Sequence, residues 1–597
     1  MKNFINTVEI WGGLECTINR VNDSYFDQLE YAGHYIRDGD IRMIASLGIK
    51  TLRYPVLWER HQPEPGAAID WRCTEAKLQQ IRDYGMNVIA GLVHHGSGPR
   101  HVNFFDGSFE QGLTTYARQV ARKFPWIKYY TPVNEPLTTA RFCGLYGHWY
   151  PHHFDELSFY KILISECKAT VMAMKAIREI NPAAELIQTD DLGKCYSTPL
   201  LKYQAEYENE RRWLSYELIC GTITPQHFMW KRLVSVGIKP GDLYYFHTNN
   251  CKPAVAGFNY YVTSERFLDE DMYKYDRQYH GGNGIHAYSD IETARVPLTE
   301  ENGPKLLIRE AWERLGLPIA ITECHLYSTR DEQMRWFHRM LETAVTLKNE
   351  GVDVRAVTAW AMLGLYGWNR LVTQPWGEYE AGIFDISGGK VRPTALATMI
   401  KKFAGGLPFR HPVLEKEGWW QRNNRFHPSC KDYHSDDLAE KESECQPLLI
   451  LDENGKFTNT MGKICSDRNI HWIAIGKSET TDKHHFYTTQ IKRLNPWAVL
   501  HSPASITNHF QQEQEFIMLA KQCAELDSRY MIWHSNDDCQ TFENILAVNP
   551  DALILYTTPH SEQASNLMHE ALNMLLDDNS GVHYMESDPI LERASIQ

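Results

Sequence analysis

The sequence predicts an α/β protein: a (β/α)₈ barrel over residues 1–407, a linker over 408–446, and a smaller Rossmann-like α/β unit over 447–597. Three observations support this prediction. Eight short apolar runs alternate with helical patterns as far as about residue 406. A polar, charged stretch then breaks the alternation, and a strand–turn–helix–strand pattern resumes at "PLLILD". A chain of 597 residues is also too long for one ordinary domain.

The eight predicted strands are short apolar segments rich in β-branched and aromatic residues. Between them, stretches such as 40–48, 115–124 and 333–351 place apolar residues three and four apart, which is typical of amphipathic helices. The strands are expected at residues 8–15, 50–56, 87–95, 127–135, 184–191, 254–262, 318–323 and 354–363.

Composition excludes several classes of protein. A net charge of −14 argues against a surface for nucleic acid or an anionic membrane. The first residues lack the apolar stretch of a signal peptide, and no run is long enough to cross a bilayer. The thirteen cysteines are scattered and odd in number, which favours reduced thiols in a cytoplasmic protein. No CxxC or HExxH motif is present, so no metal site is expected.

Two glutamates follow directly after predicted strands of the barrel. Glu135 lies in "TPVNEP", where Pro136 cannot extend a sheet, and Glu323 ends "PIAITE". The carboxyl ends of the strands of a (β/α)₈ barrel open onto one shared mouth, where enzymes with this fold carry their catalytic residues. Glycoside hydrolysis needs two carboxyl groups, one to protonate the leaving oxygen and one to attack carbon or activate water. The alternative is that each glutamate is a solvated loop residue.

Seven segments, in barrel order, resemble those of glycoside hydrolase family 1, the family of β-glucosidases and β-galactosidases. They are "WGGLECTIN", "LRYPVLWER", "GLVHHGSGP", "TPVNEP", "GFNYYV", "ITE" and "TAWAMLGLYGW". The resemblance implies a retaining, two-step mechanism through a covalent glycosyl-enzyme, with Glu135 as general acid/base and Glu323 as nucleophile. It further implies that Asn134 bonds the sugar 2-hydroxyl.

The same resemblance implies supporting roles for four more residues. Arg53 and Tyr261 would hold Glu323 ionised, His94 would touch the sugar, and Trp360 would lie under the sugar ring. Physical chemistry agrees with this division, because an acid needs a raised pKa and a neighbouring arginine favours a charged nucleophile. A carbohydrate substrate is therefore the expected partner.

This chain differs from the family at the positions that bind the sugar hydroxyls. The usual glutamine on the first strand is Asn19, for which Glu15 is a possible substitute. The usual glutamate before Trp368 is Gly367, and the indole after the third-strand histidine is His95. Cys324 and His325 follow the nucleophile in place of asparagine and glycine. We expect open space beside Trp368, and a deoxy, acidic or otherwise modified β-sugar in preference to a simple glucoside.

Other polar and aromatic residues near the predicted mouth have two readings. Asp190 and Asp191 end the fifth strand and are either sugar contacts or solvated acids. His148 and Trp149 follow the acid/base strand and either line the mouth or pack.

The linker and the tail are predicted to be non-catalytic. Trp419 and Trp420 are expected to pack the linker against the barrel. In the tail, "LNPWAVLHSPA" resembles a segment of dTDP-4-dehydrorhamnose reductases. Its first turn offers only Gly455 and Gly462, seven residues apart, so the tight phosphate-binding turn is missing. That family's Tyr-x-x-x-Lys pair is also missing, because no lysine follows Lys521. No cofactor is expected.

The leading hypothesis is a retaining β-glycosidase with a non-standard glycone pocket. Two alternatives remain: a non-catalytic carbohydrate-binding protein on the same barrel, and a bifunctional sugar-nucleotide enzyme. The sequence leaves open whether the protein forms a homo-oligomer.

Overall fold

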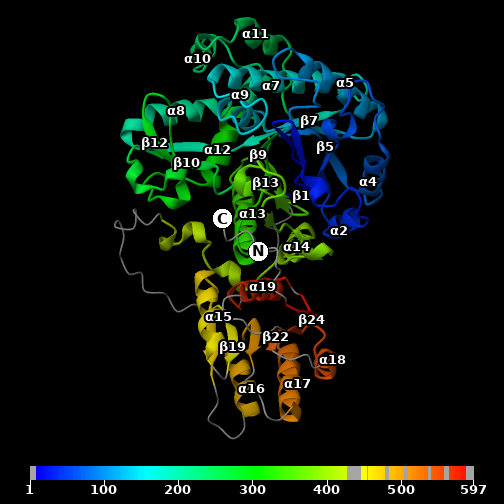
Figure 1. Cartoon of the computed structure of the whole chain (residues 1–597), viewed down its shortest axis with the longest axis vertical. Helices are drawn as coiled ribbons and strands as arrows, with labels where there is room; N and C mark the ends of the chain where they lie inside the picture. Colours follow the sequence, from blue (N-terminus) through cyan, green and yellow to red (C-terminus); the bar gives the residue numbers. More distant parts are fainter. Residues whose placement is uncertain are drawn as a thin grey trace.

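The computed structural model describes two α/β units. Figure 1 shows the barrel in blue to green and the smaller unit, in yellow to red, beyond helices α13 and α14. The described residues are 8–426, 445–452, 455–476, 483–502, 509–534, 539–556, 564–577 and 579–585. The predicted linker is thus described as far as residue 426 and from 445, and its part 427–444 lies outside the described residues.

Eight parallel strands close the barrel, and each coincides with one of the eight predicted segments, one of them ending a single residue beyond its segment, at Cys324, which confirms the barrel prediction. In the order of the closed sheet they are β1 (Glu9–Gly13), β14 (Val354–Ala359), β13 (Ile319–Cys324), β9 (Val255–Asn259), β7 (Glu185–Asp191), β6 (Tyr129–Asn134), β5 (Asn87–His94) and β4 (Thr51–Pro55). Every carboxyl end therefore opens onto one mouth.

Inside the barrel, one layer of apolar side chains closes the floor. Trp11, Ile89, Ile187, Ala320 and Ala356 form this cluster, one from each of five strands, and all are buried. A single large indole among small and branched neighbours fills the tapering interior, so the barrel is a packed core and not a pore.

Helices surround the barrel and follow the predicted patterns. The longer ones are α2 (Asp40–Ser46), α4 (Arg72–Asp83), α5 (Ser108–Lys123), α7 (Glu156–Arg178), α8 (Lys202–Arg211), α9 (Leu214–Cys220), α11 (Pro240–Thr248), α12 (Pro304–Leu315), α13 (Arg330–Asn349) and α14 (Ala395–Ala404). The shorter ones are α1 (Gln28–Tyr31), α3 (Trp58–His61), α6 (Pro136–Ala140) and α10 (Trp230–Ser235).

Small sheets extend the connections between barrel elements. One four-stranded sheet has the order β11 (His280–Gly282), β12 (Ala287–Glu292), β10 (Glu265–Asp269) and β8 (Lys194–Ser197). Three pairs complete the set: β2 (Ile18–Val21) with β3 (Ser24–Asp27), β15 (Leu365–Tyr366) with β16 (Tyr379–Glu380), and β17 (Phe384–Asp385) with β18 (Arg392–Pro393).

The second unit is a parallel six-stranded sheet with the order β20-β19-β21-β22-β23-β24. Its elements are β19 (Leu448–Asp452), α15 (Lys456–Asp467), β20 (Trp472–Ile475), α16 (Lys483–Leu494), β21 (Ala498–Ser502), α17 (His509–Glu525), β22 (Arg529–His534), α18 (Cys539–Val548), β23 (Leu553–Tyr556), α19 (Ala564–Leu576) and β24 (Gly581–Tyr584). The sheet is consistent with the predicted Rossmann-like unit. Its order reverses between β19 and β21, and the described residues place one strand beyond β19, where the dinucleotide-binding order has two.

The two glycines of the first turn in this unit have separate local uses. Gly455 precedes α15 with a φ of +72°. Gly462 lies within that helix, and a Cβ there would meet the Trp472 ring at 2.6 Å. Gly462 thus allows close packing of the helix on β20.

Candidate active site

The ends of four barrel strands bring Glu135, Glu323, Arg53 and Asn259 into one hydrogen-bonded group. Glu135 follows β6, Glu323 lies on β13, Arg53 on β4, and Asn259 ends β9. The two glutamates retain only 6% and 3% of their exposure. The reading of both as solvated loop residues is therefore wrong, because strand ends of a closed barrel converge and shield one another.

Two donors hold the Glu323 carboxylate. Arg53 Nη1 donates to Oε1 at 3.0 Å, and the Tyr261 hydroxyl donates to Oε2 at 2.5 Å. Burial raises the pKa of Glu323, while the Arg53 charge and the Tyr261 hydrogen bond act to lower it. Both oxygens thus face groups that favour the ionised form, but burial is the larger effect and the pKa of Glu323 stays above its usual value.

Glu135 lies in a different electrostatic environment. Its Oε1 accepts a hydrogen bond from Asn259 Nδ2 at 2.7 Å, and His95 Nε2 is 3.6 Å from Oε2. Burial raises the pKa of Glu135 well above its usual value, and the negative charges of Glu323, Asp191 and Asp190 raise it further. This carboxyl group therefore favours its protonated form.

The backbone at Glu135 is strained, and this conformation sets the direction of its side chain. Its φ of +47° is left-handed, which is uncommon for a residue other than glycine. Pro136 then opens α6, where its missing N–H costs nothing. The chain thus turns sharply from strand to helix at the glutamate.

Asn259 is a site residue that was not predicted from the sequence. Its Nδ2 donates to Glu135, while its Oδ1 accepts from the Thr322 hydroxyl at 2.8 Å, directly beside Glu323 in the chain. The only available signal was its place in "GFNYYV", two residues before Tyr261.

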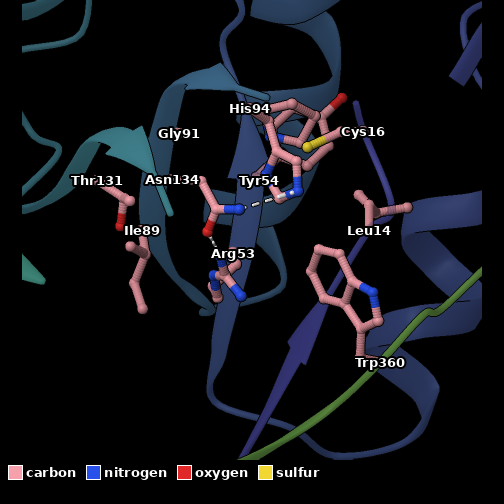
Figure 2. Close-up of a pocket in the computed structure, with 11 residues that line it drawn as sticks. Leu14, Cys16, Arg53, Tyr54, Ile89, Gly91, His94, Thr131, Asn134 and Trp360 are labelled. Atoms are coloured by element: carbon pink, nitrogen blue, oxygen red, sulfur yellow. Dashed lines mark hydrogen bonds between the residues drawn. The ribbon is translucent and has the colours of Figure 1, made fainter. Parts of the chain in front are cut away.

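Asn134, His94 and Trp360 lie at the floor of the site. Figure 2 shows Asn134 between His94 and Arg53, with hydrogen bonds to both. Arg53 Nη2 donates to Asn134 Oδ1 at 2.9 Å, and Asn134 Nδ2 lies 3.3 Å from His94 Nε2. Burial lowers the pKa of His94 well below its usual value, so its ring is neutral and Nε2 accepts. A cavity of about 20 Å³ among these side chains is large enough for one water molecule.

Trp360 is placed by close contact with a glycine. A Cβ at Gly13 would lie 2.5 Å from the indole, so only glycine permits this approach. The Trp360 ring is parallel to that of His94, with centroids 5.7 Å apart. Its Nε1 is buried and has no hydrogen-bond partner among the described residues. An unsatisfied donor at the floor of a polar site suits a hydroxyl-rich ligand.

Glu15 and Asn19, the two candidates on the first strand's loop, differ in their contacts. Glu15 is buried and accepts from the Thr17 backbone N–H at 3.0 Å. Burial, followed by the Glu323 charge, raises the pKa of Glu15 to about 7. Asn19 Nδ2 instead donates to the Val372 carbonyl at 2.8 Å, so this amide anchors the loop after β14.

That loop, residues 367–377, corrects one expectation from the sequence. Gly367 was expected to leave open space beside Trp368. Instead, a Cβ at Gly367 would meet the Trp376 carbonyl oxygen at 2.8 Å, so the returning backbone fills the space. The loop holds five left-handed residues, and its carbonyls accept from Asn19 and, at Leu371, from Trp149 Nε1. The five are Gly367, Leu371, Val372, Trp376 and Gly377.

Replacing Gly367 with alanine is expected to lower the free energy of unfolding by about 3 kcal/mol, because backbone strain and a clash with backbone act together. Gly388 is a matched control: its φ is also +70°, but nothing lies within 4 Å of its Cβ position. Gly388→Ala should cost about 1–2 kcal/mol from strain alone. Denaturant unfolding of the two variants measures the difference, and equal losses would contradict the filled space.

A buried carboxylate near this loop, Glu380, was also missed. It pairs with Leu365 across the β15–β16 ribbon, and its Oε2 lies 3.1 Å from His325 Nε2. Its charge contributes to the raised pKa of Glu15, so the two carboxyl groups are neighbours. Nothing in its local sequence separates Glu380 from the exposed Glu378 two residues before it, because its burial depends on the fold of the loop.

The aromatic residues of the mouth have mixed roles. Trp149 is buried at 1% and packs, so it offers no sugar platform. Trp368 is half-buried, lies edge-on to His95 at 5.5 Å, and has an Nε1 without a partner among the described residues. His148 packs edge-on against Phe142.

Asp190 and Asp191 are both held by local hydrogen bonds, so neither is a freely solvated acid. Asp190 accepts from the Leu137 N–H at 3.2 Å, and Asp191 accepts from the Ser264 hydroxyl at 2.6 Å. Their charges act on Glu135.

Asp191→Asn is therefore expected to lower the pKa of Glu135. An acid catalyst loses its proton as pH rises, so the alkaline limb of kcat/KM should move to lower pH in this variant. Asp290→Asn is the control, because Asp290 faces Arg266 and is absent from the charges acting on Glu135. A limb that stays in place or moves to higher pH would contradict the effect of Asp191.

The described part of the chain offers neither a metal-binding cluster nor a helix suited to a membrane. No cluster of three or more His, Cys, Asp or Glu side chains there is arranged to bind a metal ion. Among the described helices, none combines the length and apolar character needed to cross a membrane.

Comparison with solved structures defines the class of fold. The closed barrel of eight parallel strands has the same fold as the barrels of solved TIM-barrel glycosidases. A family 1 β-glucosidase from Thermotoga maritima matches with a TM-score of 0.55 and 14% sequence identity, over 69% of this chain and 100% of that one. The same organism's β-glucosidase in complex with cyclophellitol matches with a TM-score of 0.54 and 14% identity, over 69% and 99%. The sequence matches no protein-family profile. At such identity, the likeness shows the fold alone.

Proposed function

We propose that this protein is a retaining β-glycosidase in which Glu135 is the general acid/base and Glu323 the nucleophile. The contrast between the two carboxyl groups carries the proposal. Glu323 accepts from Arg53 and Tyr261, whereas Glu135 faces carboxylates and a neutral imidazole. Two carboxyl groups whose environments divide them into a base and an acid are what hydrolysis of a glycoside requires.

In the first step, Glu323 attacks the anomeric carbon while Glu135 gives its proton to the glycosidic oxygen. The aglycone leaves as an alcohol, and the sugar remains as an ester of Glu323. In the second step, Glu135 takes a proton from water, whose oxygen displaces Glu323 from the sugar. Glu135 ends protonated and Glu323 ionised, so the cycle closes.

The floor of the site supplies contacts for the glycone. Asn134 is proposed to bond the sugar 2-hydroxyl, with His94 beside it, and Trp360 to lie under the ring. The unsatisfied Nε1 atoms of Trp360 and Trp368 are further donors for sugar oxygens. The backbone of residues 376–377 fills the space at Gly367. No room is left there for an extra substituent on the sugar.

The charges around the site restrict which sugars are expected to bind. Glu15, Glu323 and Glu380 are buried there beside the protonated Glu135, while Arg53 is the cation in contact with Glu323. Burial lowers the pKa of His95 to about 3, so its ring adds no positive charge. Among the modified sugars left open by the sequence, a uronic acid would be repelled. Neutral or amino sugars are favoured.

The test is a panel of 4-nitrophenyl β-glycosides, assayed with the wild type and with Glu323→Gln. The expected result is hydrolysis of a neutral or amino sugar with retained configuration, loss of activity in Glu323→Gln, and at least tenfold lower kcat/KM for β-glucuronides. Binding of sugars without turnover by the wild type would favour the carbohydrate-binding alternative. An inverted product would exclude the two-step mechanism.

A further inference from the structure

The smaller C-terminal unit contacts the barrel at the starts of two helices that follow catalytic-site strands. These are α13, six residues after the β13 strand, and α14, which follows β14 and its loop. Figure 1 shows α19 of the smaller unit beside α13 and α14. In a barrel of this type, a helix begins at the mouth, where its preceding strand ends. The contact is therefore made at the rim of the site.

One carboxylate of the smaller unit reaches both helix starts. Asp577, just after α19, accepts a hydrogen bond from the backbone N–H of Ala395, the first residue of α14, at 2.7 Å. The same oxygen lies 2.7 Å from Arg330 Nε, at the first residue of α13. The first N–H groups of a helix have no partner within it, so Asp577 provides a cap from a distant part of the chain.

A second contact buries a charged network at the same place. Asp331 is fully buried between Arg468, with Nε at 2.7 Å, and Arg335, with Nη1 at 3.0 Å. Burial alone would raise the pKa of Asp331, but the two arginines outweigh it and lower it. Arg335 also donates to the carbonyls of Arg468 and Asn469. A buried charge held by partners in two units fixes their relative position.

The described part of the linker packs against the barrel at the same place, as predicted for Trp419 and Trp420. Trp420 is buried, and its ring is edge-on to that of Trp336 in α13 at 4.9 Å. The Trp419 backbone N–H donates to Glu332 Oε2 at 3.0 Å, and Glu332 also pairs with Arg422.

The contact continues from α13 into the site. Gln333, in the first turn of α13, donates to the carbonyls of Leu326 and Ala381 at 3.1 and 3.0 Å. Leu326 follows His325 in the segment between Glu323 and α13, and Ala381 follows Glu380, the partner of His325. A short series of direct contacts thus joins Asp577 and Arg468 to the segment that holds the proposed nucleophile.

We propose that the C-terminal unit is a brace for the catalytic mouth, with Asp577 and Arg468 as positioning residues that act through the start of α13. This role rests on the proposed function, and it requires no ligand in the smaller unit. This role explains why the chain carries a second unit in which the first-turn glycines, Gly455 and Gly462, form a turn and allow a helix to pack. An error of about 1 Å in placing a reacting group can cost about 100-fold in rate.

The test compares Asp577→Ala with Glu217→Gln in the full-length chain. Glu217 is a matched control, because its buried carboxylate pairs with Arg314 at 2.8 Å between α9 and α12 in the barrel. Competent sites are counted by the burst of dinitrophenol from a 2-deoxy-2-fluoro glycoside. For Asp577→Ala, kcat/KM per competent site should fall about 10- to 100-fold. Glu217→Gln should stay within about twofold of wild type.

Asp577→Asn separates the two contacts of Asp577, since its amide oxygen still accepts from Ala395 while the charge opposite Arg330 is lost. An intermediate loss is expected. A purely structural role would lower the number of competent sites and leave the rate per site unchanged, and that result would overturn the proposal.

Hydrogen exchange distinguishes failure of the brace from failure of the proposed function. Amides in peptides covering residues 324–333 should exchange faster in Asp577→Ala than in Glu217→Gln, whether or not the wild type hydrolyses glycosides. Unchanged exchange in these peptides would overturn the brace even in an active enzyme.

Discussion

Replacing Glu323 with glutamine is expected to lower kcat by at least about 10⁴-fold, because the amide cannot form the glycosyl ester. The fold should persist, since glutamine has the size of glutamate and its amide oxygen still accepts from one of the two donors, Arg53 or Tyr261. Steady-state kinetics with an activated aryl glycoside measures the loss. Circular dichroism checks that the protein is folded.

Covalent trapping identifies the residue directly. A 2-deoxy-2-fluoro glycoside should inactivate the wild type, and mass spectrometry of the digested protein should place the added sugar on the peptide containing Glu323. Glu15→Gln is the control, because Glu15 is buried beside Glu323 but has no proposed covalent role. The Glu15→Gln variant should still be inactivated and labelled by the 2-deoxy-2-fluoro glycoside. A label on Glu15 or Glu380 would refute the assignment of Glu323.

Glu135→Ala is expected to have an effect that depends on the leaving group. A poor leaving group needs the proton that Glu135 provides, so its kcat/KM should fall by about 10²–10⁴-fold. A dinitrophenyl glycoside leaves as a stable anion, and its first step should change much less. Comparing alkyl, nitrophenyl and dinitrophenyl glycosides of one sugar measures this dependence.

Azide provides the companion test. With Glu135 removed, a small anion can enter from the face that Glu135 occupied and displace Glu323, giving a β-glycosyl azide with retained configuration. Equal losses for all leaving groups, together with no azide product, would show that Glu135 is not the acid.

The parts of the fold predicted from sequence are those that depend on local patterns. Each barrel strand is a short apolar run bounded by helical periodicity, so all eight were found. Glu135 and Glu323 were recognised as candidates because a strand end is a position that the sequence itself displays. The structure brings them together with Arg53 and Tyr261, as the resemblance implied.

The parts that could not be predicted depend on contacts between distant segments. The space at Gly367 is filled by a backbone nine residues later, and the path of a loop with five left-handed residues leaves no periodic signal. Asn19, expected on the first strand, similarly lies beyond it on β2 and donates to Val372. The order of strands in the second unit also depends on pairing that alternation does not specify.

The loop of residues 367–377 has a consequence for protein engineering. Leu371, Val372 and Trp376 adopt φ values of +50° to +64°, which branched and bulky side chains rarely tolerate, so this segment keeps its path through its anchors and not through local preference. Replacing one of these three residues with glycine would release strain without producing a new shape. To give this barrel a different sugar preference, all eleven residues should therefore be exchanged as one block, together with Asn19 and Trp149.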